Sequence, residues 1–135
     1  MQKITIEELI DLAKEVTCPI RLSKFSTGGT VGCALLSKKG KVFTGISLNI
    51  SSGLGDCAEY NAIANMVATG ESEIAKIVAV SFKGEILPPC GKCRELMYEV
   101  NVKNLKTKII LSKNKSLTLK EALPCNWQVK FKSLF

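Results

Sequence analysis

The stretch "PPCGKC", Pro88–Cys93, places two cysteines three positions apart at the start of a helical segment. A thiol pair at this spacing can be a redox couple, half of a structural zinc site, or part of a catalytic metal centre. The continuation "GKCRELMYEV" carries apolar side chains at helical spacing and predicts a helix over residues 91–100. The choice between the three kinds of site therefore depends on the rest of the sequence.

A further cysteine opens a second predicted helix. In "CAEYNAIANMVAT", which begins at Cys57, alanine, isoleucine and methionine recur three or four positions apart, and Gly70 supplies a helix stop. Helix N-termini stabilise negative charge and so favour the thiolate form that binds metal. Because helix N-termini gather at one edge of an open α/β sheet, we expect Cys57, Cys90 and Cys93 to converge.

The remaining segments complete an α/β pattern. Thr5 and Glu8 form a capping box at the start of "TIEELIDLAKEV", which predicts an N-terminal helix. Runs rich in β-branched residues predict five strands, at residues 31–36, 41–48, 76–82, 107–112 and 116–119. A short polar turn separates the first strand from the second, and another separates the fourth from the fifth. Each of these two pairs is therefore predicted to form an antiparallel hairpin. We expect one domain, residues 1–135, with a three-layer α/β/α sandwich around a central mixed five-stranded sheet.

Composition narrows the possible partners. The net charge of +7 comes from residues 101–135, which hold eight lysines against Glu121, whereas residues 1–100 hold 11 basic and 11 acidic side chains. This tail has no arginine and few aromatics, which favours a solvated lysine face over a nucleic-acid surface. Glu7 and Glu8 interrupt any signal-peptide pattern, and no segment is apolar for long enough to cross a membrane. We therefore expect a cytoplasmic protein without membrane partners and consider nucleic acid an unlikely ligand.

The six cysteines and the lack of histidine restrict the metal chemistry. Disulfides are rare in a reducing compartment, and any transition-metal site here must be rich in thiolates. Three thiolates around Zn(II) leave one tetrahedral position open to water, as in a catalytic site. Glu59 lies two residues after Cys57 and is the candidate general acid and base.

"CAE" followed by "PCGKCRE", with 33 positions between the leading cysteines Cys57 and Cys90, resembles the zinc-dependent cytidine deaminase family, including the blasticidin S deaminases. Pro89 belongs to the second motif, and "VGCALLSKKGKVFTG" and "LKEALPCNW" are similar to the family's first hairpin and C-terminal end. The resemblance implies one Zn(II) per chain on Cys57, Cys90 and Cys93, with Glu59 moving protons. The implied reaction is hydrolytic deamination of a free cytosine nucleoside, namely cytidine, deoxycytidine or a cytosine-containing analogue such as blasticidin S.

The resemblance also implies roles around the substrate. Backbone groups at Ala58 would hold the pyrimidine ring, and Phe25 would pack against it. Ser47 and Asn49 stand where typical cytidine deaminases carry an Asn-x-Glu pair that grips the ribose. Arg94 would support the metal site by offsetting the charge of the thiolates, and Pro89 of the second motif is a further supporting residue. The position after "CAE", often arginine in the family, is Tyr60. Members with three cysteine ligands are usually tetramers, so the resemblance implies a homotetramer.

Several alternatives remain open from the sequence. Cys18, Cys33 or Cys125 could close a structural zinc site, although we expect these three as small buried apolar groups. A redox couple at Cys90 and Cys93 would leave "CAE" unexplained. A nucleic-acid deaminase would use the lysine-rich tail, but the predicted C-terminal hairpin argues against it. A deaminase fold without turnover would be a binding module.

Overall fold

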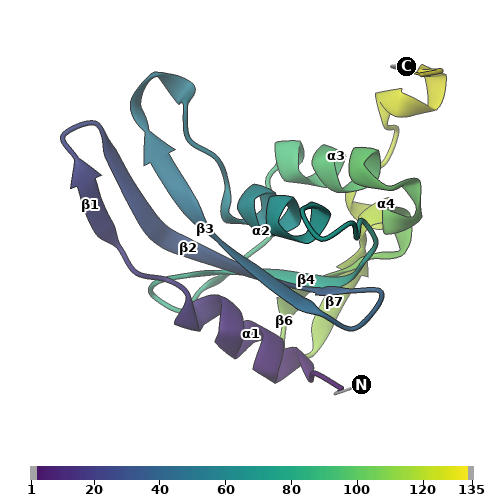
Figure 1. Ribbon diagram of the computed structural model, residues 1–135. Helices are drawn as coiled ribbons and strands as arrows, with labels where there is room; N and C mark the ends of the chain where they lie inside the picture. Colours follow the sequence, from purple (N-terminus) through teal and green to yellow (C-terminus); the bar gives the residue numbers. More distant parts are fainter. Residues whose placement is uncertain (1–2, 134–135) are drawn as a thin grey trace.

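The computed structural model describes residues 3–133 and shows a mixed sheet with helices on both faces (Figure 1). Its strands are β1 (Ile20–Ser23), β2 (Ser26–Ser37), β3 (Val42–Ile50), β4 (Ile74–Ser81), β5 (Ile86–Leu87), β6 (Lys108–Ser112) and β7 (Lys115–Thr118). Its α-helices are α1 (Ile6–Glu15), α2 (Ala58–Val67), α3 (Gly91–Val100) and α4 (Leu119–Ala122). Three short 3-10 helices are η1 (Ser51–Gly53), η2 (Val102–Lys106) and η3 (Trp127–Lys130).

The sheet is mixed, as predicted, but it contains two more strands than the sequence indicated. Its order is β1-β2-β4-β6-β7, with β3 paired to β2 and β5 paired to β4. β4 and β6 run parallel, whereas both predicted hairpins, β2–β3 and β6–β7, are antiparallel. The prediction of five strands is wrong because β1 is exposed along its whole length and β5 has only two residues. Neither strand carries the alternation of buried residues that marks a strand in the sequence.

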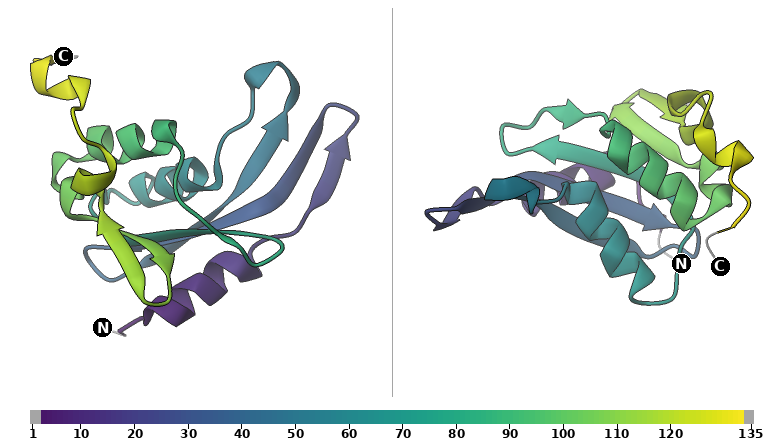
Figure 2. Two further views of the ribbon diagram at one scale, coloured as in Figure 1. Left: turned by 180° about the vertical axis from the view of Figure 1, so that it is seen from behind. Right: turned by 90° about the horizontal axis from the view of Figure 1, so that it is seen from above.

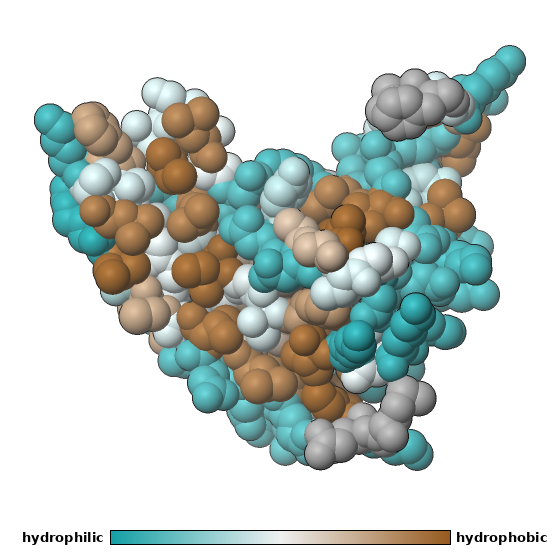
Figure 3. Space-filling view, viewed as in Figure 1, coloured by the Kyte–Doolittle hydropathy of each residue, from teal (hydrophilic) through white to brown (hydrophobic). Residues whose placement is uncertain are grey.

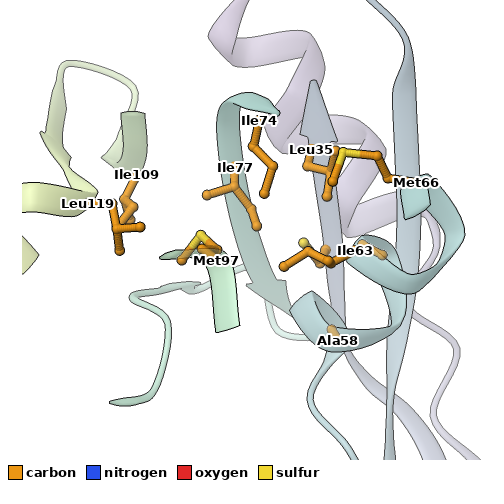
Figure 4. Packing of buried hydrophobic residues seen from close by; sticks show 11 residues of the cluster. Leu35, Ala58, Ile63, Met66, Ile74, Ile77, Met97, Ile109 and Leu119 are labelled. Atoms are coloured by element: carbon orange, nitrogen blue, oxygen red, sulfur yellow. The ribbon is translucent and has the colours of Figure 1, made fainter. Parts of the chain in front are cut away.

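Two hydrophobic clusters fill the two spaces between sheet and helices, which confirms the three-layer arrangement. One joins α1 to one sheet face, and its buried members are Leu9, Ala13, Ala34, Val78, Val80 and Ile110. The other joins α2 and α3 to the opposite face, as Figure 4 shows for Leu35, Ile63, Ile77 and Met97. Burial of each large aliphatic side chain contributes about 1.5–3 kcal/mol, so these clusters hold the helices firmly on the sheet.

Two glycines allow helices to lie unusually close to the strands. A Cβ on Gly32 would come within 2.1 Å of the Ala13 carbonyl oxygen in α1. A Cβ on Gly45 would come within 2.3 Å of the backbone nitrogen of Ala62 in α2. Any side chain at either position would force a helix away from the sheet. The close approach at Gly45 brings α2, and with it Cys57, down onto β3.

The β2–β3 hairpin extends well beyond the predicted segments. β2 begins at Ser26 instead of Val31, and β3 continues to Ile50. The β2–β3 register shifts between Gly28 and Gly32, so the added part changes direction. With β1 and η1 it forms an arm that projects from the body of the sheet, which we call the β1–β3 arm (Figures 1 and 2).

The C-terminal hairpin ends in a short helix. Leu119 was predicted to belong to the last strand, but it is the first residue of α4. The prediction is wrong there because Thr118 caps the helix: its hydroxyl accepts from the Glu121 amide at 3.2 Å, and the Glu121 carboxylate accepts from the Thr118 amide at 2.9 Å. Within residues 3–133, none of the helices combines the length and apolar character needed to span a membrane.

Candidate active site

The starts of α2 and α3 present the cysteines of the two motifs. Cys57 is the N-cap residue of α2 and Cys90 is the N-cap residue of α3. Both side chains lie at the start of a helix, where the thiol sulfur is accessible as a metal ligand. Cys93 lies in the first turn of α3 and is fully buried.

The three thiols converge as predicted. The Sγ atoms of Cys57 and Cys90 are 3.5 Å apart, those of Cys90 and Cys93 are 3.6 Å apart, and all three lie within 4.8 Å of one another. Tetrahedral zinc with Zn–S bonds of about 2.3 Å separates its sulfur ligands by about 3.8 Å. The donor set and its spacing therefore fit Zn(II), with three protein ligands and one open position.

The other three cysteines do not complete a closed site. All six cysteines are free, and within residues 3–133 the group that could hold a metal contains only Cys57, Cys90 and Cys93. Cys33 is buried in the core, as expected. The same expectation is wrong for Cys18 and Cys125, which are exposed. Both lie in segments that connect helices and strands, outside the two hydrophobic clusters.

The surroundings give the three thiols different acidities. Burial raises the pKa of Cys57 and of Cys93. Burial also raises the pKa of Cys90, but hydrogen bonds from the Cys93 backbone and from the Cys57 and Cys93 thiols outweigh it, so the net shift is downward. Cys90 is thus the thiol that ionises most readily, as suits a residue at a helix N-terminus.

Glu59 is a buried carboxyl beside these thiols. Its side chain is only 6% exposed, and it lines the same cavity as Cys57 and Cys90. Burial raises the pKa of Glu59, although a hydrogen bond from its own backbone opposes the shift. A carboxyl whose pKa is moved toward neutrality is suited to exchange protons with a bound molecule.

The cavity runs from the thiols to the β1–β3 arm and has a volume of about 800 Å³. Phe25, Ser47 and Asn49 all line it, together with Ala58 next to the metal site. Phe25 is 60% exposed, so it forms the open rim of the cavity and is not part of the core. The structure thus brings every predicted substrate residue to the cavity that contains the thiols.

Hydrogen bonds hold Ser47 and Asn49 against β2. The Ser47 hydroxyl accepts from the backbone amide of Val31 at 3.1 Å and lies 3.2 Å from the Thr30 hydroxyl. The Asn49 amide donates to the same Thr30 hydroxyl at 3.4 Å. Sequence analysis missed Thr30, and it carries no motif that could have revealed it, because the β2 extension brings it to the cavity.

A charged pair at the cavity wall was also missed. Lys92 forms an ion pair with Asp56, and its ammonium lies 5.0 Å from the centre of the Tyr60 ring. The Asp56 side chain, through its hydrogen bond, raises the pKa of Lys92. Asp56 directly precedes Cys57 and Lys92 lies between Cys90 and Cys93, but the sequence carries no signal that pairs two charges 36 positions apart.

Arg94 was predicted to offset thiolate charge, but its hydrogen bonds in the structure go to backbone carbonyls. Its Nε donates to the carbonyl of Pro89 at 2.9 Å, and its Nη1 donates to the carbonyl of Ala122 at 3.1 Å. Pro89 is buried just before the first ligand of α3. Arg94 therefore ties the loop that carries Cys90 to α4, while its role in offsetting thiolate charge stays a prediction.

Comparison with known proteins agrees with this site. Residues 4–109 match the family described as "Cytidine and deoxycytidylate deaminase zinc-binding region". A cytidine deaminase of Halalkalibacterium halodurans is 39% identical over 71 residues, which cover 52% of this chain and 54% of that protein. The chain thus spans about half the length of this curated relative. A blasticidin-S deaminase of Bacillus cereus is 32% identical over 98 residues, covering 58% and 70%.

A solved structure extends the likeness to the whole fold. The crystal structure of a cytidine deaminase from Mycobacterium tuberculosis superposes with a TM-score of 0.75 at 26% identity, covering 93% of this chain and 98% of that one. The family match covers the segment that carries all three thiols and Glu59. The chain belongs to the cytidine and deoxycytidylate deaminase zinc-binding family.

Proposed function

We propose that this chain is a hydrolase that removes the exocyclic amine of a free cytosine nucleoside, namely cytidine, deoxycytidine or a cytosine-containing analogue such as blasticidin S. One observation carries the proposal: three thiols from two helix starts lie within 4.8 Å of one another, and two of them, Cys57 and Cys90, line one cavity together with the buried carboxyl of Glu59. A redox couple at Cys90 and Cys93 would use neither Cys57 nor Glu59.

Cys57, Cys90 and Cys93 would hold one zinc ion per chain. Bound zinc supplies a Lewis acid for the activation of water and the stabilisation of developing negative charge. The reaction consumes one water: the ring carbon loses its bond to nitrogen and gains a carbonyl oxygen, a ring nitrogen gains a proton, and ammonia leaves. Glu59 would move the two protons of the water, one to the ring nitrogen and one to the departing amine, because its carboxyl is buried beside the site and burial raises its pKa.

We also propose how the substrate is oriented in the cavity. Backbone groups at Ala58 would hold the ring at the metal end, while Phe25, Ser47 and Asn49 would meet the sugar. Among the described residues that line the cavity, the carboxylates are Glu59 and Asp56, and Asp56 is paired with Lys92. The sugar end therefore offers neutral hydroxyl and amide groups in place of a carboxylate acceptor for sugar hydroxyls, so cytidine is one candidate beside deoxycytidine and cytosine-containing analogues.

We further propose that residues 1–135 form a single deaminase domain and that four copies of the chain form a homotetramer. Both core clusters lie on one sheet, which supports the single domain. The β1–β3 arm supports the assembly, because it carries exposed apolar side chains (Figure 3), including Ile20, Leu22, Phe25 and Leu54. A cytoplasmic location is supported by the six free cysteines.

The test is ammonia release by zinc-loaded protein from cytidine, deoxycytidine, cytosine and blasticidin S, with Glu59→Gln measured alongside. We expect release from at least one substrate and a loss of about 10²- to 10⁴-fold in Glu59→Gln, with zinc retained at one per chain. Zinc binding without release from any substrate would contradict the proposal and favour a binding module.

A nucleic-acid substrate has less support. The lysines of residues 101–135 would attract a phosphate backbone, but they are not accompanied by arginine. β6 and β7 form an antiparallel hairpin, unlike the parallel last strand common among deaminases that resemble the tRNA type. Salt-dependent binding of a single-stranded oligonucleotide, with deamination of it, would reverse this preference.

A further inference from the structure

The two motifs that supply the zinc ligands are joined by a charged contact. Asp56, directly before Cys57, pairs with Lys92, which lies between Cys90 and Cys93. We propose that Asp56, Lys92 and Tyr60 form a brace that holds the start of α2 against the start of α3 and so positions the zinc ligands. The proposal rests on the zinc site of the proposed function but does not depend on turnover.

The brace spans the two helix starts whose separation determines the distance between Cys57 and Cys90. Local helix geometry does not determine this distance. Cys90 and Cys93 share the first turn of α3, so local helix geometry determines their separation. Cys57 comes from α2, 33 positions earlier in the sequence, yet its Sγ lies 3.5 Å from that of Cys90. Only the relative placement of the two helix starts can maintain that distance.

Lys92 contacts the α2 side twice. Its ammonium pairs with the Asp56 carboxylate and also lies 5.0 Å from the centre of the Tyr60 ring. Asp56 is itself fixed, because its backbone exchanges two hydrogen bonds with Leu48 of β3, at 2.9 Å and 3.1 Å. A side chain from the turn of α3 is therefore anchored to a backbone position held by the sheet.

A different role for Lys92 would be to offset the negative charge of three thiolates around one dication. The two roles predict opposite effects of neutralising Asp56. If Lys92 acts by charge alone, removing the Asp56 carboxylate makes the surroundings more positive and retains zinc more strongly. If the pair acts as a brace, the same change frees Lys92 and loosens the site.

The experiment measures the rate at which zinc passes from the protein to a chromophoric chelator in excess. The variants are Asp56→Asn, Lys92→Met and the double variant, all starting with one zinc per chain. We expect each single change to speed zinc release about three- to tenfold, and the double variant to be no faster than the faster single one. The exchanged pair, Asp56→Lys with Lys92→Asp, should recover part of the loss.

A second ion pair provides a matched control. Lys103 lies 3.7 Å from Glu73, away from the cavity, and its side chain is 69% exposed compared with 57% for Lys92. Lys103→Met removes the same charge and should leave zinc release unchanged. High salt should speed release from the unaltered protein but not from the double variant.

Slower or unchanged release from Asp56→Asn would overturn the brace. Additive effects of the two single changes would overturn it as well. Tyr60→Phe, which keeps the aromatic face, should release zinc at the original rate, whereas Tyr60→Leu should speed release. Because no substrate is present, these results are independent of the deamination test.

Discussion

The two ends of the cavity are built in different ways. At the metal end, Cys93, Ala58 and Glu59 are buried, and their positions follow from helix starts packed on the core. At the other end, Phe25 and Asn49 are exposed on the β1–β3 arm, which leaves the body of the sheet. The proposed zinc ligands and proton carrier thus lie against the packed core, whereas the residues proposed to contact the sugar lie on a segment with few core contacts.

This difference separates the type of reaction from the choice of substrate. The proposed ligands and proton carrier come from two short motifs at the starts of α2 and α3, which are packed on the same core cluster. The sugar end depends on a long hairpin with a shifted register, where side chains can change without disturbing the core. We therefore expect changes at the metal end to abolish function and changes on the arm to alter selectivity.

The largest effect is expected from Cys93→Ala. Loss of one of three thiolates should reduce bound zinc from one per chain to nearly none, and ammonia release should disappear with it. Cys33→Ala is the matched control, since it also removes a fully buried thiol from the core behind the site. It should retain zinc and lose about 1 kcal/mol of stability. Zinc content is measured by atomic absorption in both variants. One zinc per chain in Cys93→Ala would show that this thiol is not needed at the metal end.

Most of the sheet could be predicted because buried strands leave a strong pattern. β4 and β6 are runs of β-branched residues that pair in parallel. The antiparallel pairing of β2 with β3 and of β6 with β7 confirms the two predicted hairpins. β1 was missed because its four residues are all exposed. The start of β2 was missed because Ser26–Thr30 contains two glycines and three hydroxyl residues, a composition that favours loops over strands.

The metal end could likewise be predicted, and the rest of the cavity could not. The starts of helices gather at one edge of an α/β sheet, so two motifs at helix starts were enough to predict that the three thiols converge. Thr30 and the Asp56–Lys92 pair depend on contacts between distant segments, which spacing in the sequence does not encode. The same limit applies to Arg94, whose partner at Ala122 is set by the unpredicted helix α4.

An intermediate effect is expected from Arg94→Met, which tests how firmly the metal end is held. The change removes two hydrogen bonds from a charged donor to the carbonyls of Pro89 and Ala122, and it should reduce the free energy of unfolding by about 1.5–3 kcal/mol. Arg21→Met is the control on the arm, because Arg21 is exposed on β1 and should change stability little. Urea denaturation compares the two variants. Equal losses would mean that the two regions are held with similar strength.

The smallest effect is expected from Asn49→Glu, which sharpens the difference at the arm. A carboxylate at the sugar end would accept hydrogen bonds from sugar hydroxyls, so the KM for cytidine should fall about three- to tenfold with kcat nearly unchanged. Asn49→Gln lengthens the side chain without adding charge and should not reproduce the gain. Free cytosine has no sugar, and its KM should stay the same in both variants. An equal fall in KM for cytosine would show that residue 49 acts on the ring end of the cavity, and the division between the two ends would then fail.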